Sequence, residues 1–128
     1  MAKWLTAEWM DEYLKMAQSQ PLRPGATAAI QFEILNGPNG NVFYYWIVED
    51  GKLVECKLGE LDEPEVVLSQ EWNDAMAIQK CELDATAAFM QGKIKVTGNM
   101  GKLMALLPIT TSDEYRDLQT AVAAVTQF

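Results

Sequence analysis

An Asp-Gly pair at residues 50–51, set between two strand-like segments, limits the fold more than any other feature of the chain. The segments 42–49 (VFYYWIVE) and 52–58 (KLVECKL) are rich in β-branched and aromatic residues, and Asp-Gly between such segments is typical of a two-residue β-hairpin. A hairpin sets the register of its two strands. With Glu49 opposite Lys52, the pairs predicted to share the core face are Ile47–Val54, Tyr45–Cys56 and Phe43–Leu58.

The preceding segment supplies a further strand on the same face. In residues 28–34, Ile30, Phe32 and Ile34 alternate with other residues, which is typical of a strand with one buried face. We expect these three side chains to share the core face with the hairpin pairs. Strand 42–49 would then also be apolar on its other face, through Tyr44, Trp46 and Val48. This pattern predicts a layer behind the strand, most simply a terminal helix.

Residues that cap or end helices predict where the helices of the chain begin and stop. Helices are predicted to begin at Thr6, Ser69, Asp84, Asn99 and Ser112, because these residue types are preferred at helix N-termini. The first covers residues 6–19, the third ends at Gly92, the fourth stops at Pro108 and the last covers residues 112–126. Two more strands are predicted at 63–69 and 93–97. Strands in a run, then helices, with one late strand, indicate a single α+β domain over residues 1–128.

Charge and composition exclude several classes of function. The chain has 128 residues, a net charge of −8 and no histidine. The negative charge opposes binding to nucleic acid and docking on anionic lipid surfaces. Without histidine there is no Ser-His or Cys-His nucleophile pair and no His-ligated zinc, and two cysteines are too few for a four-thiolate metal site. We therefore expect a protein that is not an enzyme and needs no cofactor or metal.

Three absences bear on location. No apolar run approaches the ~20 residues of a membrane span, and the first residues, MAKWLTAEW, lack the apolar segment of a signal peptide. The last residues, Val-Thr-Gln-Phe, do not form a peroxisomal targeting tripeptide of the Ser-Lys-Leu type. The expected location is cytoplasmic, with at most transient membrane contact.

A glycine-containing turn at residues 92–107 (GKIKVTGNMGKLMALL) raises the question of phosphate binding. Neither a dinucleotide fingerprint nor a P-loop fits, because Val96 replaces the leading glycine of both patterns. An RNA-binding GxxG loop fits in letters only, since the chain lacks basic charge. Gly98 and Gly101 are therefore predicted to allow close packing of strand and helix. The following stripe at helical spacing either fills the core or lines a cavity; it consists of Met100, Leu103, Met104 and Leu107.

Residues 86–107 (TAAFMQGKIKVTGNMGKLMALL) closely resemble the signature of the sterol carrier protein 2 family. The similarity extends more weakly upstream, through IQFEILNGPNGN (30–41), the hairpin and the helical segment from Ser69, and covers about residues 28–107. The resemblance implies a mixed five-stranded sheet covered by helices, which encloses an apolar tunnel for fatty acids, fatty acyl-CoA, sterols or other lipids. It also implies binding without catalysis. The N-terminal helix and the C-terminal helix are then additions to the matched region.

The resemblance assigns tunnel-lining positions residue by residue. The predicted lining comprises Phe89, Met90, Met100, Leu103, Met104 and Leu107, to which the strand register adds Phe32, Tyr45 and Ile47. Gln91 is the candidate contact for a ligand head group, and the alternative is that it bonds to the neighbouring helix end. Binding to such a tunnel is expected to change little between pH 6 and 8, because no side chain titrates there at its ordinary pKa.

Two other functions remain open at this stage. The fold can serve as a protein-interaction or enzyme-accessory module whose tunnel is filled by side chains. It can also act on a hydrophobic acid through carboxylates such as Glu33, Glu49 or Asp84, although these are more simply surface or capping residues. The C-terminal helix has three predicted roles: covering the tunnel mouth, packing behind the sheet, or pairing with a second chain as a homodimer.

Overall fold

A computed structural model describes residues 2–128 and places a five-stranded sheet at the centre of the molecule. The strand order is β4-β3-β2-β5-β6, and the strands are β2 (Ala28–Gly37), β3 (Gly40–Glu49), β4 (Lys52–Leu58), β5 (Val66–Glu71) and β6 (Ile94–Gly98). Strands β2 and β5 are parallel, whereas the other neighbours are antiparallel. The predicted mixed five-stranded sheet of an α+β fold is therefore confirmed.

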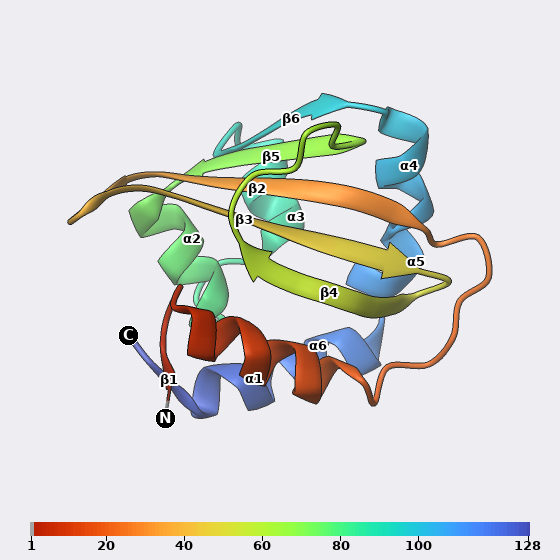
Figure 1. Cartoon of the computed structure of the whole chain (residues 1–128), viewed down its shortest axis with the longest axis horizontal. Helices are drawn as coiled ribbons and strands as arrows, with labels where there is room; N and C mark the ends of the chain where they lie inside the picture. Colours follow the sequence, from red (N-terminus) through yellow and green to blue (C-terminus); the bar gives the residue numbers. More distant parts are fainter. Residues whose placement is uncertain (1) are drawn as a thin grey trace.

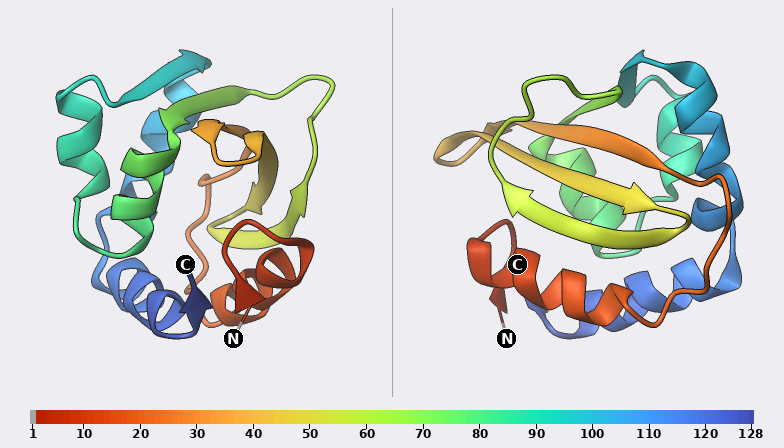
Figure 2. Two further views of the ribbon diagram at one scale, coloured as in Figure 1. Left: turned by 90° about the vertical axis from the view of Figure 1, so that its left-hand side faces the viewer. Right: turned by 45° about the vertical axis from the view of Figure 1, so that its right-hand side comes forward.

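Helices cover one face of this curved sheet (Figures 1 and 2). They are α1 (Ala7–Ala17), α2 (Trp72–Gln79), α3 (Ala85–Met90), α4 (Met100–Ala105), α5 (Leu107–Thr110) and α6 (Asp113–Ala124). Helices α1 and α6 lie side by side below the sheet, and α2 packs against β2 and β5. The core lies between the sheet and these helices, with Met10, Ile34, Val66 and Cys56 among its least exposed side chains.

The predicted register of the β3–β4 hairpin is correct at the turn and wrong beyond it. Glu49 pairs with Lys52 and Val48 with Leu53, but Ile47 then pairs with Glu55. Val54 is therefore an extra residue in β4, as in a β-bulge, and every pair after it is shifted by one position. The predicted pairs Ile47–Val54, Tyr45–Cys56 and Phe43–Leu58 do not form.

The two faces of β3 are the reverse of those predicted, and the pairing of β3 with β2 sets them, since even the unshifted pair Val48–Leu53 lies in the core. Trp46 pairs with Ile30 on one side and with Cys56 on the other, and Tyr44 pairs with Phe32. The core face of β3 consists of Tyr44, Trp46 and Val48. Phe43, Tyr45 and Ile47 lie on the opposite face, where they are only partly buried. The prediction that Ile30, Phe32 and Ile34 are buried is confirmed, at 2%, 7% and 1% exposed.

A loop, and not a terminal helix, covers the back of the sheet. The connection from β4 to β5, residues 59–65, crosses the outer face of β3 and β2 (Figure 1). Gln31, which is 4% exposed, holds it there. Its amide nitrogen donates to the carbonyl oxygens of Tyr44 and Gly59, both at 3.0 Å, and its amide oxygen accepts from the Leu61 amide at 2.7 Å. The face of β3 that carries Tyr44, Trp46 and Val48 is covered by a terminal helix, α1, as predicted, but this face belongs to the core, and the loop covers the opposite face.

Four of the five predicted helix caps are confirmed. The side chains of Thr6, Asp84, Asn99 and Ser112 each accept a hydrogen bond from a backbone amide three residues later. Ser69 does not cap a helix, because strand β5 continues beside β2 as far as the Leu35–Glu71 pair. The Ser69 hydroxyl donates a hydrogen bond to the Glu33 carboxylate instead. The helix capped by Asn99, α4, ends at Ala105, shortly before Pro108, but Pro108 itself begins a further helix. It lies in the first turn of α5, where its missing amide proton costs nothing.

The two chain ends meet and hold α1 and α6 together. Short strands β1 (Ala2–Lys3) and β7 (Thr126–Gln127) pair in parallel. The Trp9 indole donates to the Thr126 hydroxyl at 2.9 Å in the buried interior. The Trp4 ring lies 4.8 Å from that of Trp72, which connects the ends of the chain to α2.

The glycine turn before α4 serves close packing. Gly98 has a φ of +107°, and a Cβ built on it would lie 2.4 Å from the Glu65 carbonyl oxygen. The Asn99 amide donates to the same oxygen at 2.7 Å. The side chain of Glu65 in turn accepts from the Ala29 amide and pairs with Lys102. The turn therefore joins β6, the loop before β5 and α4, in agreement with the prediction for Gly98.

Candidate functional site

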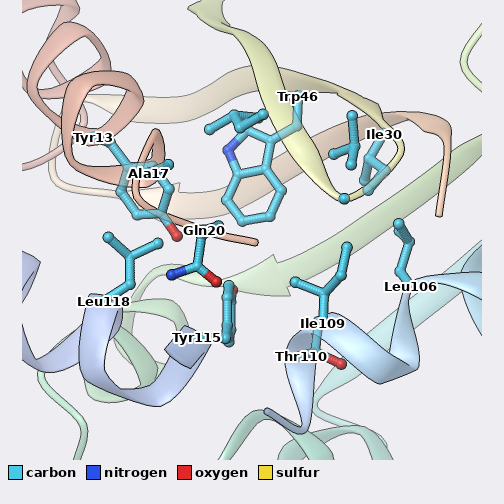
Figure 3. A pocket seen from close by; sticks show the side chains of 13 residues that line it. Tyr13, Ala17, Gln20, Ile30, Trp46, Leu106, Ile109, Thr110, Tyr115 and Leu118 are labelled. Carbon is cyan, nitrogen blue, oxygen red and sulfur yellow. The ribbon is translucent and has the colours of Figure 1, made fainter. Parts of the chain in front are cut away.

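A cavity of about 50 Å³ lies between the core face of the sheet and helices α1, α5 and α6 (Figure 3). Thirteen residues line it: Tyr13, Ala17, Gln20, Ile30, Trp46, Val48, Gly51, Leu53, Leu106, Ile109, Thr110, Tyr115 and Leu118. They come from four separate parts of the chain, so the cavity exists only in the folded protein.

Helical spacing brings the lining residues of α1 and of α6 onto one face of each helix. Tyr13 and Ala17 are four residues apart in α1, and Tyr115 and Leu118 are three apart in α6, so each pair lies on one helical face. The strand side is formed largely by Trp46, whose ring lies 5.5 Å from that of Tyr13. The aromatic rings therefore close the space between sheet and helices.

The cavity is uncharged. None of its thirteen lining side chains is ionised at neutral pH. Burial raises the pKa of Tyr13 well above its usual value of 10, and the neighbouring Tyr115 adds to this rise. Burial likewise raises the pKa of Tyr115. A space of this kind favours apolar molecules and penalises an unpaired charge.

Gln20 is the polar exception in the lining. It follows α1, is 6% exposed, and lies between Tyr13 and Tyr115 (Figure 3). Its amide nitrogen donates to the Glu114 carbonyl oxygen at 2.9 Å. Its amide oxygen is buried and has no hydrogen-bond partner among residues 2–128. Such an unsatisfied buried acceptor is uncommon in folded proteins and calls for an explanation.

An open groove of about 440 Å³ runs along the outside of the cavity, between α1 and α6. Its lining comprises Met16, Ser19, Gln20, Glu114, Asp117, Leu118 and Ala121. Gln20 and Leu118 therefore line both the groove and the cavity. The outer part of the groove carries the two carboxylates, Glu114 and Asp117.

The structure places the predicted strand residues outside the cavity lining. Phe32 is buried in the core, where its ring stacks on Tyr44 at 4.5 Å. Tyr45 and Ile47 point to the outer face because β3 pairs with β2 so that Tyr44 and Trp46 lie opposite the buried Phe32 and Ile30. Their assignment to the core face was wrong, and their role in ligand binding stays a prediction.

The residues assigned by the family signature lie mostly at the surface of α3, α4 and α5. Phe89 and Met90 are 45% and 81% exposed, and Gln91 is also exposed at the C-terminal end of α3. In the second stripe, Leu103 packs against the core, whereas Met100, Met104 and Leu107 are exposed. None of these positions lines the cavity of Figure 3. Their contact with a ligand stays a prediction.

Several lining residues were not singled out from the sequence. Tyr13 was visible only as part of the apolar face of α1, and Trp46 was assigned to the wrong face. Gln20 carries no local signal, since a single glutamine after a helix is unremarkable in composition and spacing. Its importance depends on Glu114, 94 residues away, which occupies its amide nitrogen.

The carboxylates considered for catalysis are engaged elsewhere. Glu33 accepts a hydrogen bond from Ser69, Asp84 caps α3, and Glu49 is exposed beside the hairpin turn. Burial raises the pKa of the Cys56 thiol to about 12, so it stays protonated and unreactive at neutral pH. Within residues 2–128, no group of three or more carboxylate or cysteine side chains is arranged to hold a metal ion. In the same range, no helix is long and apolar enough to span a membrane.

Comparison with known proteins identifies the class. The model of the SCP-2 sterol transfer family matches residues 10–110, and the chain belongs to this family. Proteins of this family are typically non-catalytic, and membership supports lipid binding or transfer in general. No curated protein sequence matches the chain.

Solved structures share the fold at low sequence identity. A crystal structure of sterol carrier protein 2 matches with a TM-score of 0.71 and 16% identity, over 98% of this chain and 100% of its own. A conserved hypothetical protein from Thermus thermophilus matches with a TM-score of 0.66 and 16% identity, over 96% and 92%. Palmitated SCP2L2 from Aedes aegypti matches with a TM-score of 0.63 and 18% identity, over 88% and 96%.

Proposed function

We propose that this protein binds one hydrophobic ligand with a long apolar chain, such as a fatty acid, a fatty acyl-CoA or a sterol-like molecule, without catalysis. The observation that carries the proposal is the uncharged, aromatic-lined cavity between the sheet and α1, α5 and α6, in a member of a lipid-transfer family. Binding would be driven by apolar burial, at about 25 cal/mol per Å² removed from water before ordering costs.

The ligand must enlarge the cavity to enter. A volume of about 50 Å³ is far below the roughly 300–1,000 Å³ of typical ligand sites. The adjoining groove of about 440 Å³ provides the missing space. Gln20, after α1, and Leu118, in α6, line both spaces and therefore lie where the two would connect. We therefore expect binding to be accompanied by a local separation of α1 and α6.

Transfer of the ligand would require brief contact with a membrane, and the segment 85–112 has suitable chemistry. It contains three lysines and no Asp or Glu, in a chain whose net charge is −8. It also carries five of the ten large hydrophobic side chains that are exposed within residues 2–128: Phe89, Met90, Met100, Met104 and Leu107. Apolar side chains combined with local positive charge favour a transient contact with anionic lipid.

Native mass spectrometry of the purified protein tests the proposal directly. We expect a bound mass from the host cell, or a complex formed on addition of palmitate, palmitoyl-CoA or cholesterol. Palmitate is a suitable first probe because SCP2L2 from Aedes aegypti has been solved in a palmitated form. Affinity should be flat between pH 6 and 8 for a ligand that does not titrate there, because the tyrosines of the lining ionise well above this range.

The small volume of the cavity also favours a second candidate function. If aromatic side chains keep the space permanently filled, the fold would serve as a protein-interaction or enzyme-accessory module. This candidate predicts an apo mass that does not change with any of the three ligands. It also predicts no ligand-induced rise in the melting temperature, because a molecule that does not bind the folded state cannot stabilise it.

A further inference from the structure

The cavity and the groove meet at a single polar group. Gln20 lies at their shared wall, and Leu118 is its apolar neighbour there. Any apolar chain that passes from the groove into the cavity must pass these two residues. The polar end of the ligand enters after its apolar chain or stays at the entrance. In either case it would lie beside the Gln20 amide.

The orientation of this amide is determined by its partner. The backbone carbonyl oxygen of Glu114 can only accept a hydrogen bond, so the group 2.9 Å from it must be the amide nitrogen. The amide oxygen then faces away from Glu114 and is buried without a partner. An acceptor in this state is stabilised by any group that donates a hydrogen bond to it.

The surroundings of this oxygen disfavour an anion. No cationic side chain lines the cavity, and the groove contributes the carboxylates of Glu114 and Asp117. Arg23 pairs with Glu114 at 3.4 Å and is therefore already engaged. A carboxylate or phosphate placed here would meet an acceptor oxygen and, toward the groove, the carboxylate of Asp117, and it would lose its hydration without gaining a cationic partner from the lining.

We propose that Gln20 is the head-group contact of this site and that it selects apolar ligands whose polar end is an uncharged hydroxyl group, admitted between α1 and α6. The proposal rests on the proposed function, because it specifies the ligand of the same cavity. It gives to Gln20 the role that the family signature suggests for Gln91, which is exposed at the end of α3.

Three ligands of equal chain length separate the chemistry of the head group. Hexadecanol donates a hydrogen bond, methyl palmitate only accepts one, and palmitate is a carboxylate at pH 7.5. Their affinities are measured by displacement of a fluorescent probe and checked by native mass spectrometry. We expect hexadecanol to bind about tenfold more tightly than methyl palmitate, as for one hydrogen bond to a buried acceptor, and palmitate to bind most weakly. Equal affinity for alcohol and ester, or a preference for palmitate, would overturn the proposal.

Two glutamine variants locate the contact. Gln20→Met removes the acceptor at nearly constant length, and we expect the preference for alcohol over ester to disappear. Gln91→Met makes the same chemical change at the rival position and should keep the preference. The opposite result would overturn the proposal. Melting temperatures show whether each variant folds, and the comparison of the three ligands on the unmodified protein does not depend on either variant.

A charge variant tests the entrance. Asp117→Asn removes a carboxylate from the groove, and we expect palmitate to bind two- to threefold more tightly at low salt, with no gain at high salt because of screening. Asp113→Asn is the matched control, since Asp113 lies in the same helix but outside the groove lining. An equal effect of both variants would indicate general electrostatics and would rule out this entrance.

The experiments distinguish two kinds of failure. If hexadecanol, methyl palmitate and palmitate all leave the apo mass unchanged, the proposed function itself is wrong. If all three bind with equal affinity, the protein binds apolar chains but Gln20 does not select them. In that case the proposed function stands and only the inference about the head group is rejected.

Discussion

Helices α1 and α4 each carry two methionines, but they bury them very differently. In α1, Met10 is 1% exposed and Met16 packs against the core, whereas in α4, Met100 and Met104 are 48% and 57% exposed. Both helices show regular apolar spacing in the sequence. The difference teaches that spacing identifies which residues share a face but does not show whether another layer covers that face.

The reason lies in what surrounds each helix. Helix α1 has 11 residues and lies along β4, with α6 beside it and the paired chain ends at its start. Helix α4 has six residues and follows the edge strand β6. Its inward contacts come from Leu103, and Leu106 at its end is 6% exposed. Met100 and Met104, at helical spacing from Leu103, stay about half exposed because α4 lies at this edge of the sheet.

Alkaline pH should produce the largest contrast between the two regions. Burial raises the pKa of Tyr13, Tyr44 and Tyr115 above the ordinary value of 10, and segment 85–112 contains no tyrosine. Above pH ~10 the unfolded chain releases these protons while the folded chain retains them. The free energy of unfolding is therefore unaffected below that pH and falls above it, by up to ~4 kcal/mol at pH 11 for three groups.

Urea unfolding at pH 8.5 and pH 11, with tyrosinate absorbance recorded in parallel, measures this loss. The tyrosines of α1 and α6 should ionise together with unfolding. Ionisation of all tyrosines near pH 10 in the folded protein would show that the α1–α6 side is open to water, and would remove the contrast with α4.

A matched pair of methionine truncations should give the next largest difference. Met10→Ala creates a cavity in the core and is expected to lower the free energy of unfolding by about 3 to 4 kcal/mol. Met104→Ala, in an exposed helical position, should change it by less than about 0.5 kcal/mol. Denaturant titrations of both variants provide the measurement. Similar losses would mean that α4 is covered in solution, contrary to its exposure in the structure.

The two glycines that flank β6 offer a test of the close packing at its end. Gly98→Ala combines a φ of +107° with contact to the Glu65 carbonyl, so we expect a loss of about 2 to 3 kcal/mol. Gly92→Ala has a φ of +77° but open space around it, and should cost about 1 kcal/mol. Melting temperatures and denaturant midpoints give both values. An equal cost would show that only backbone conformation matters at Gly98.

The smallest expected effect concerns the bond that joins the two chain ends. The Thr126 hydroxyl accepts from the Trp9 indole at 2.9 Å in a buried position. Thr126→Val keeps the shape and leaves that indole unpaired, which should cost about 1 to 2 kcal/mol. Thr120→Val, in the same region but exposed, removes only a bond to the Arg116 carbonyl and serves as the control. If both variants lose the same stability, the chain ends contribute nothing specific to the packing of α1 and α6.

Sequence patterns alone predicted the helix caps and the hairpin turn, because interactions between neighbouring residues determine these features. The caps at Thr6, Asp84, Asn99 and Ser112 depend on side chains that bond within three residues, and the Asp50-Gly51 turn depends on its own backbone. The signature at residues 86–107 was sufficient to predict the family and, with it, the mixed sheet.

The tertiary structure decided what depends on distant parts of the chain. Val54 became an extra residue because β3 pairs with β2 through Tyr44 and Trp46, and this pairing reversed the faces predicted from the hairpin. The cavity formed beside α1 and α6, away from the signature residues. Gln20 became its polar group only because Glu114, 94 residues later, binds its amide nitrogen and leaves the oxygen free. Hydrogen bonds and burial between remote segments have no local pattern, so only the folded chain reveals them.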